Sequence, residues 1–211
     1  MELFVGQAAL QGGIRRYPFE LLELLVDSSL PQDKKLAEFR EAKPNCVFSL
    51  RLPPSVAESG RAGEAALERT LRAVPALGAR WCVLTTGPST TPTQRNREAL
   101  TRVFERLRAV GPRLAWEPRG VWGVAEAESW AAELGVTLVR DVSRDDPPPG
   151  DVVYTRLRAL GFGSRVGASA VERLASRLAD ASEAYVVIEG DGAARAATLL
   201  RQLCVGGFSA D

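Results

Sequence analysis

Short apolar segments alternate with amphipathic segments along nearly the whole chain. Eight segments are rich in apolar residues and end at Gly, Pro, Ser or a charged residue, which is typical of short buried strands. We expect these strands at residues 3–6, 21–26, 47–52, 81–85, 114–117, 137–141, 152–157 and 185–189.

The segments between the strands carry apolar residues at helical spacing. In residues 93–110 a stripe of apolar residues follows Thr93, which can cap a helix, and Gly111-Pro112 ends the pattern. Similar stripes follow Asp33 and Ser169, and a third ends before Pro75. Strands alternating with helices in this way predict an α/β fold, and eight strands in this length predict a small (β/α)8 TIM-type barrel.

We expect residues 1–204 to form a single barrel domain and residues 205–211 to form a C-terminal tail. The run Pro147-Pro148-Pro149-Gly150 predicts a stiff loop at the barrel rim, since too little chain flanks it for a domain boundary. The segment between Gly6 and Glu23 is too short, and too rich in turn residues, for a full first helix. The pattern therefore leaves open whether the barrel is complete at its first β/α unit.

The composition excludes several kinds of chemistry. The 211 residues include no histidine, which rules out Ser-His-Asp and Cys-His catalysis and imidazole metal ligands. The formal charge of +1 gives no overall field toward nucleic acid, so we do not expect a nucleic-acid partner. No apolar run approaches the length of a membrane span, and we expect no membrane partner.

The three cysteines Cys46, Cys82 and Cys204 lie far apart, without a CxxC pair. Neither a disulfide framework nor a zinc site is indicated, and we expect the protein in the reducing cytoplasm.

Alternation along the strands predicts which side chains face the barrel interior. Successive side chains of a strand point to opposite sides, so where one alternate set is apolar and faces the helices, the other set faces the lumen. Charged residues of that second set lie at or near the carboxyl ends of their strands, where active sites of TIM barrels are built. They are Glu23, Arg51, Glu117, Arg119, Asp141, Arg156 and Glu189.

These charges have two interpretations. In one, arginines and carboxylates only neutralise each other in a polar barrel mouth. In the other, the arginines hold a small anionic ligand, Trp122 walls the mouth, and Glu117 and Glu189 act as general acid and base if the protein is an enzyme. The neighbouring arginines argue against a metal ion on these carboxylates, and we expect neither a metal nor a cofactor.

Several short motifs, in order along residues 3 to about 203, resemble the YecE-like family of TIM-barrel proteins of unknown function. They include Phe19-Glu20-Leu21-Leu22-Glu23, Val47 to Pro53, Trp116-Glu117-Pro118-Arg119 and Val153-Tyr154-Thr155-Arg156-Leu157. The resemblance implies a TIM barrel, and it implies site roles for Glu23, Glu117, Arg119, Asp141 and Arg156.

The chain departs from the family pattern at several polar positions. Arg51 stands where the family has lysine, Gly120 and Arg158 replace histidines, and Glu189-Gly190 replaces paired asparagines. The resemblance therefore implies a barrel that binds a small anionic ligand, or a protein partner, without necessarily turning it over. Two alternatives stay open: a metal-independent hydrolase of a glycosidic or phosphodiester bond, and a scaffold that forms homodimers.

Overall fold

Eight parallel strands form one sheet in the order β6-β5-β4-β3-β2-β1-β8-β7 in the computed structural model, which describes residues 1–58, 60–159 and 165–205. Arg140, just after β6, makes a parallel bridge to Thr155 of β7, so the two edges of the sheet meet in a nearly closed barrel. The predicted TIM-type barrel is thus confirmed. The strands are β1 (Glu2–Gln7), β2 (Leu21–Leu25), β3 (Val47–Leu52), β4 (Trp81–Thr85), β5 (Arg113–Glu117), β6 (Thr137–Leu138), β7 (Val152–Arg158) and β8 (Glu183–Glu189).

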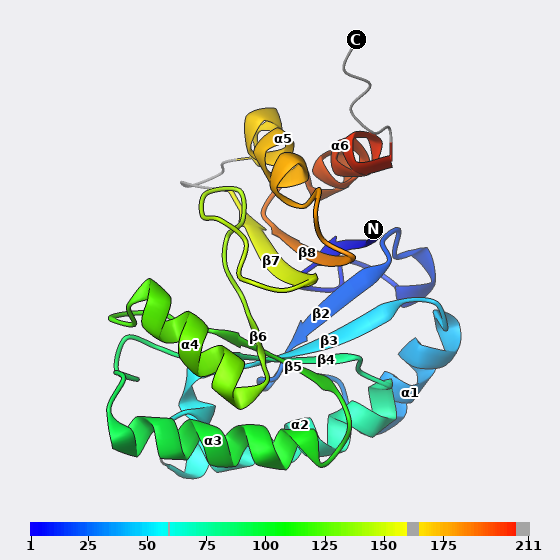
Figure 1. Cartoon of the computed structure of the whole chain (residues 1–211). Helices are drawn as coiled ribbons and strands as arrows, with labels where there is room; N and C mark the ends of the chain where they lie inside the picture. Colours follow the sequence, from blue (N-terminus) through cyan, green and yellow to red (C-terminus); the bar gives the residue numbers. More distant parts are fainter. Residues whose placement is uncertain (59, 160–164, 206–211) are drawn as a thin grey trace.

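Helices cover the outside of the sheet (Figure 1). Thr93 caps α3 as predicted, its hydroxyl accepting the backbone N–H of Asn96. The helices of the described residues are α1 (Asp33–Ala42), α2 (Arg61–Leu77), α3 (Gln94–Arg108), α4 (Val124–Leu134), α5 (Ala168–Arg177) and α6 (Ala193–Val205), with short 3-10 turns at Ile14–Arg16 and Pro54–Val56.

The first β/α unit lacks an α-helix, as the short segment predicts, and a 3-10 turn takes its place. The barrel is nevertheless continuous there, because β1 pairs with both β2 and β8. The buried hydroxyl of Tyr17 strengthens the short β1–β2 pairing: it accepts the N–H of Gln7 at 2.9 Å and donates to the carbonyl of Leu21 at 2.7 Å.

The structure corrects two predicted boundaries. Helix α2 does not end before Pro75 but continues to Leu77. A proline in the last turn removes only one backbone hydrogen bond, so the helix can continue past it. Gly78, at φ +67°, ends the helix. The sixth strand is only two residues long, rather than spanning 137–141, and the segment after it reaches β7 without a helix.

The proline run lies in this helix-free connection and leads into β7, so it sits at the amino end of the strands. Val205 is still helical, and the rest of the predicted tail, residues 206–211, lies outside the described residues. Among the described residues, no helix has the length and apolar character needed to span a membrane.

The apolar residues form two layers that match the predicted alternation. One layer lies between strands and helices and holds Phe48, Leu50, Trp116, Val186 and Ile188. The other fills the barrel interior with Val83, Ala115, Tyr154, Tyr185 and further apolar side chains. This inner layer closes the lumen below the carboxyl ends of the strands, so the charged side chains above it form a mouth and not a pore.

Candidate active site at the barrel mouth

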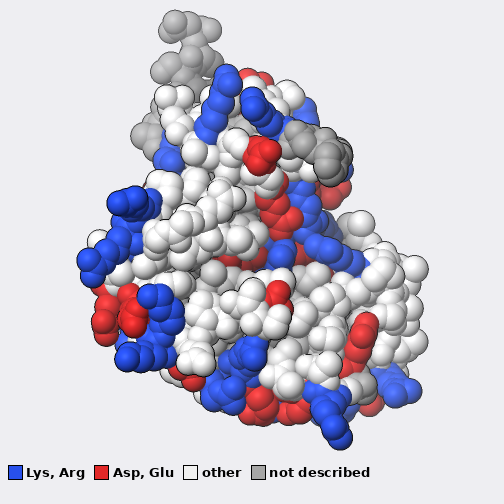
Figure 2. Space-filling model, turned by 180° about the vertical axis from the view of Figure 1, so that it is seen from behind, with Lys and Arg blue, Asp and Glu red and all other residues white. Residues whose placement is uncertain are grey.

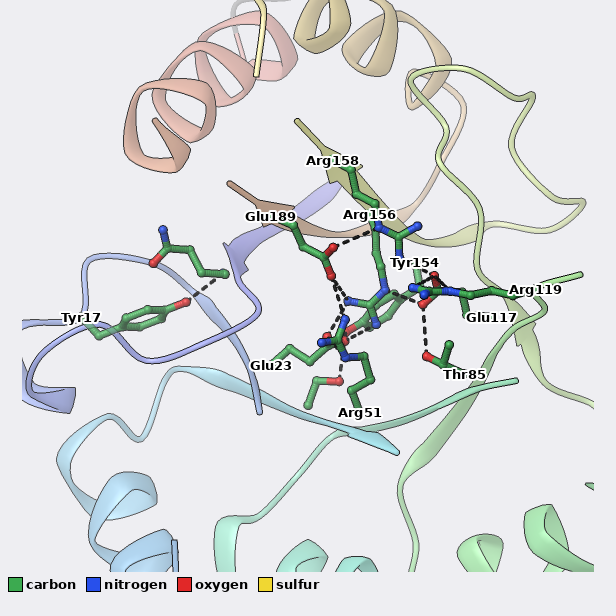
Figure 3. Close-up of polar contacts among 12 residues, drawn as sticks. Tyr17, Glu23, Arg51, Thr85, Glu117, Arg119, Tyr154, Arg156, Arg158 and Glu189 are labelled. Atoms are coloured by element: carbon green, nitrogen blue, oxygen red, sulfur yellow. Dashed lines mark hydrogen bonds and ion pairs between the residues drawn. The ribbon is translucent and has the colours of Figure 1, made fainter. Parts of the chain in front are cut away.

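Seven charged side chains meet at the carboxyl ends of the strands (Figure 3). The strand register brings them together, since Arg158 of β7 lies beside Glu189 of β8, and Thr85 of β4 lies beside Glu117 of β5. We call this group the mouth cluster; it comprises Glu23, Arg51, Glu117, Arg119, Arg156, Arg158 and Glu189.

Arg156 is the centre of the mouth cluster. Its side chain is 1% exposed, and its guanidinium forms a two-pronged pair with Glu23, at 2.5 Å to Oε1 and 2.7 Å to Oε2. The Nε donates to Glu117 at 2.6 Å, and Nη1 lies 3.3 Å from Glu189. A buried charge with this many partners is well compensated, which explains how a full arginine is accommodated inside the barrel.

Three further arginines close the mouth cluster on its solvent side. Arg51 donates to Glu189 at 2.8 Å. Arg158 bridges Glu189 at 3.0 Å and Glu117 at 2.5 Å, and Arg119 donates to the same Glu117 oxygen at 3.1 Å. Four guanidinium groups therefore face three carboxylates, and the cluster carries one excess positive charge.

Polar side chains from the strands complete the inner side of the cluster. The hydroxyl of Tyr154 donates to Glu23 at 2.8 Å and lies 2.9 Å from Oγ of Ser49. The hydroxyl of Thr85 donates to Glu117 at 3.3 Å. All three carboxylates thus accept hydrogen bonds on both oxygens from within the protein.

The arginines keep two carboxyl groups ionised. Burial would raise the pKa of Glu117, but Arg156, Arg158 and Arg119 outweigh burial and lower this pKa to about 2. For Glu189, burial is likewise outweighed, by Arg156, Arg158 and Arg51, and its pKa is lowered. A general acid at neutral pH needs a raised pKa, so neither carboxyl group has the property that this role requires.

A pocket of about 640 Å³ opens beside the cluster, toward the loops that follow β5 and β6. We call it the rim pocket. Arg119, Arg156 and Arg158 form its inner wall, and Trp122 and Asp141 belong to its lining. In the space-filling view of Figure 2, acidic and basic side chains lie next to each other near the middle of the face.

The structure brings six of the predicted site residues into direct contact: Glu23, Arg51, Glu117, Arg119, Arg156 and Glu189. The other two line the rim pocket but bond elsewhere. Trp122 donates to the carbonyl of Thr90 and packs on Trp116 and Trp130. Asp141 accepts the backbone N–H and the hydroxyl of Ser143.

The site prediction missed Arg158, which has two ion pairs in the cluster. Its signal was present in the sequence, because Tyr154, Arg156 and Arg158 share one parity and the strand continues one residue beyond the predicted end. No group of three or more metal-ligating side chains is found in the part of the chain that the structure describes.

Comparisons with known proteins reveal similarity in structure. A DUF72 family protein from Enterococcus faecalis matches with a TM-score of 0.75 and 14% identity, covering 98% of this chain and 97% of that one. D-psicose 3-epimerase from Clostridium cellulolyticum matches with a TM-score of 0.60 and 11% identity, covering 96% of each chain. A xylose isomerase domain containing protein from Salmonella typhimurium has a TM-score of 0.60 and 16% identity, covering 90% of this chain and 87% of that one.

No protein-family profile matches the chain, and no curated protein matches it in sequence. Identities as low as those of the structural matches establish the TIM-barrel fold alone, because this fold hosts many unrelated functions.

Proposed function

We propose that the protein binds a small anionic ligand in the rim pocket at the carboxyl end of its barrel. The observation that carries this proposal is the imbalance between donors and acceptors. The three carboxylates of the mouth cluster accept bonds on every oxygen, while Arg119 and Arg158 each keep Nη1 without a bond to a described residue. A site whose inner wall offers charged donors favours a ligand that brings negatively charged acceptors.

Binding without turnover agrees best with the electrostatics. A hydrolase that used Glu117 and Glu189 would need one protonated carboxyl group at neutral pH, and the pKa values of both groups are lowered. Both carboxylates are also held by arginines, so neither is free to approach a substrate. The names of the structural neighbours carry no reaction over to this chain, since the fold alone is shared.

Two broader proposals accompany this function. The order of the short motifs supports the proposal that this chain is a divergent member of the YecE-like family. At the compared positions it lacks the histidines and paired asparagines of that family. The three cysteines, all unpaired, support a reducing cytoplasm as the location.

A thermal-shift titration tests the function. Glucose 6-phosphate, AMP and glucuronate serve as probes, on wild type, Arg119→Gln and the control Arg106→Gln. Arg119 is suitable because it is half-exposed and, among the described residues, bonds only to Glu117, which keeps Arg156 and Arg158 as partners. Arg156 is unsuitable, because its loss leaves buried Glu23 without its main partner. Arg106 is a surface arginine of α3 that pairs with Glu64, away from the pocket.

We expect at least one anion to raise the melting temperature of wild type and of Arg106→Gln. At a ligand concentration of 100 times Kd the stabilisation is about 2.7 kcal/mol. The effect should fall sharply in Arg119→Gln. If no anion shifts wild type at millimolar concentration, or if Arg119→Gln responds like wild type, the rim pocket is not an anion site and a protein partner becomes the better hypothesis.

A further inference from the structure

Three half-exposed arginines from separate segments line the rim pocket. Arg119 follows β5, Arg144 belongs to the connection between β6 and β7, and Arg158 ends β7. Their side chains are 46%, 48% and 34% exposed. Their charged groups are therefore accessible to a ligand, in contrast to that of Arg156.

The protein's own carboxylates do not exhaust these three guanidinium groups. Arg119 and Arg158 each use Nε and one Nη on carboxylates of the mouth cluster. Within the described part of the chain Arg144 has one ion pair, with Nε at 3.5 Å from Oδ2 of Asp141; the other oxygen of Asp141 already accepts two bonds from Ser143. Each of the three arginines thus keeps donors with no bond to a described residue.

The remaining acidic residues of the pocket do not compete strongly for these donors. Glu128 pairs with Arg140 at 2.7 Å. Asp146 is 92% exposed and lies 3.7 Å from Arg177, and Asp145 is also exposed to solvent. Water screens exposed carboxylates, so their repulsion of a bound anion is weak.

The arrangement of the three arginines distinguishes between kinds of anion. A carboxylate has two oxygens in one plane, and one or two guanidinium groups are enough to bind it. A phosphomonoester has three terminal oxygens that point in different directions, each a strong acceptor. Guanidinium groups contributed by three separate segments offer donors to all three oxygens.

We propose that Arg119, Arg144 and Arg158 together bind the phosphate group of a small phosphomonoester, which rests on the proposed function and names its ligand class. Trp122, Ala127 and Val139 line the same pocket and provide apolar surface for the carbon skeleton of the ligand. Arg144 is the new element of this site, because the sequence predicts a site role for Asp141 in the same connection but not for Arg144.

The pH dependence of binding provides the first test, because the protein has no histidine. The phosphate would face Arg119, Arg144 and Arg158. The other charged groups that line the pocket are Arg140, Arg156, Arg177, Glu117, Glu128, Asp141, Asp145 and Asp146. Arginines and ordinary carboxylates do not titrate between about pH 5.5 and 8. A phosphomonoester does, with a second pKa of about 6. A change of affinity in this window therefore reports the charge of the ligand.

Calorimetric titration of the full chain should use glucose 6-phosphate, glucuronate and inorganic sulfate, at pH 5.5 and pH 7.5. Sulfate keeps two negative charges at both pH values and controls for effects on the protein. We expect glucose 6-phosphate to bind more tightly than glucuronate at pH 7.5 and to lose about fourfold in affinity at pH 5.5, where about a quarter of it is dianionic. Sulfate affinity should not change.

Arg144→Gln provides the second test, with Arg106→Gln as its matched control. Arg144→Gln should weaken glucose 6-phosphate roughly tenfold, which corresponds to one charge-assisted hydrogen bond, and should leave glucuronate nearly unchanged. Arg106→Gln should leave both affinities as in wild type. Unchanged glucose 6-phosphate affinity in a folded Arg144→Gln protein contradicts the three-arginine site.

The outcomes separate this proposal from the proposed function. If glucuronate binds as tightly as glucose 6-phosphate and both depend on Arg119, the pocket is an anion site but the phosphate assignment is wrong. If no probe binds, both proposals fail.

Discussion

At the scale of single residues, the mouth cluster is held together by Arg156. The same guanidinium compensates Glu23, Glu117 and Glu189, which come from β2, β5 and β8. Glu23 and Glu117 would be costly to bury alone, and the shared partner makes their burial tolerable, while Glu189 stays partly exposed. Arg119 and Arg158 therefore contact a carboxylate whose position Arg156 already fixes, and such preorganisation favours ligand binding.

The depressed pKa of Glu117 makes stability depend on pH. The carboxyl group has an ordinary pKa of 4.5 and a folded-state pKa of about 2. Its contribution to the free energy of unfolding is therefore fully present above about pH 5 and is lost as the pH falls toward 2. The shift corresponds to a contribution on the order of 3 kcal/mol.

Urea denaturation of wild type and Glu117→Gln at pH 7 and pH 3 measures this effect. We expect Glu117→Gln to be less stable than wild type at pH 7 and to lose less stability on acidification. Glu172→Gln changes an exposed carboxylate of α5 that has no ion pair among the described residues. This variant should lose as much stability as wild type when the pH is lowered from 7 to 3. Equal acid sensitivity of Glu117→Gln and wild type would contradict the role given to the arginines.

Sequence patterns predicted the direction of the charged side chains but not their partners. Alternation along each strand is a local property, so the inward orientation of Glu23, Arg156 and Glu189 could be predicted from a few neighbouring residues. Pairing of Arg156 with Glu23 joins residues 133 positions apart. Such a contact depends on closure of the whole barrel, and no local pattern contains it.

At the scale of elements, the close contact of β1 and β2 depends on Gly6. A Cβ atom at this position would lie 1.5 Å from the carbonyl oxygen of Leu21, so the strands could not pair at their present separation. We expect Gly6→Ala to destabilise the protein by about 3 kcal/mol or more, since backbone has to move.

Gly13→Ala is the matched control for this strand contact. Gly13 lies just before the 3-10 turn at φ −87°, and a Cβ there would meet no atom within 4 Å. We expect neutral or slightly higher stability, because alanine restricts the unfolded chain. Chemical denaturation of both variants gives the comparison, and comparable losses of stability would show that the region is sensitive to any substitution.

Elements were predicted well where an apolar run has the length of a strand, and less well where the chain uses tertiary contacts instead. β3 and β4 begin and end where their apolar runs do. The sixth strand was predicted to run to Asp141, but regular pairing ends at Leu138. Beyond it, an isolated bridge between Arg140 and Thr155 and bonds of the Thr155 hydroxyl hold the chain. Helix α2 passes Pro75 for a similar reason, since its last turn packs against α1 through Arg40.

At the scale of the whole molecule, the side chain of Thr155 reinforces the parallel bridge with Arg140 that joins the two edges of the barrel. The buried hydroxyl of Thr155 donates to the carbonyl of Arg140 at 2.7 Å and accepts the N–H of Val142 at 3.1 Å. The connection that begins here carries Asp141 and Arg144, the outer wall of the rim pocket. The bonds of Thr155 therefore support both the closure of the barrel and the shape of the pocket.

Thr155→Val tests this dependence, because valine has nearly the shape of threonine and lacks the hydroxyl. The backbone groups of Arg140 and Val142 then lose their partner, and we expect a loss of about 1–3 kcal/mol in the free energy of unfolding. Hydrogen exchange at the Val142 amide should become at least several-fold faster, while amides of β3, on the far side of the barrel, change only as much as global stability requires. Thr155→Ser keeps the hydroxyl and should protect Val142 better than Thr155→Val. If the valine variant protects this amide as well as wild type does, other contacts close the seam, and the outer wall of the rim pocket does not depend on Thr155.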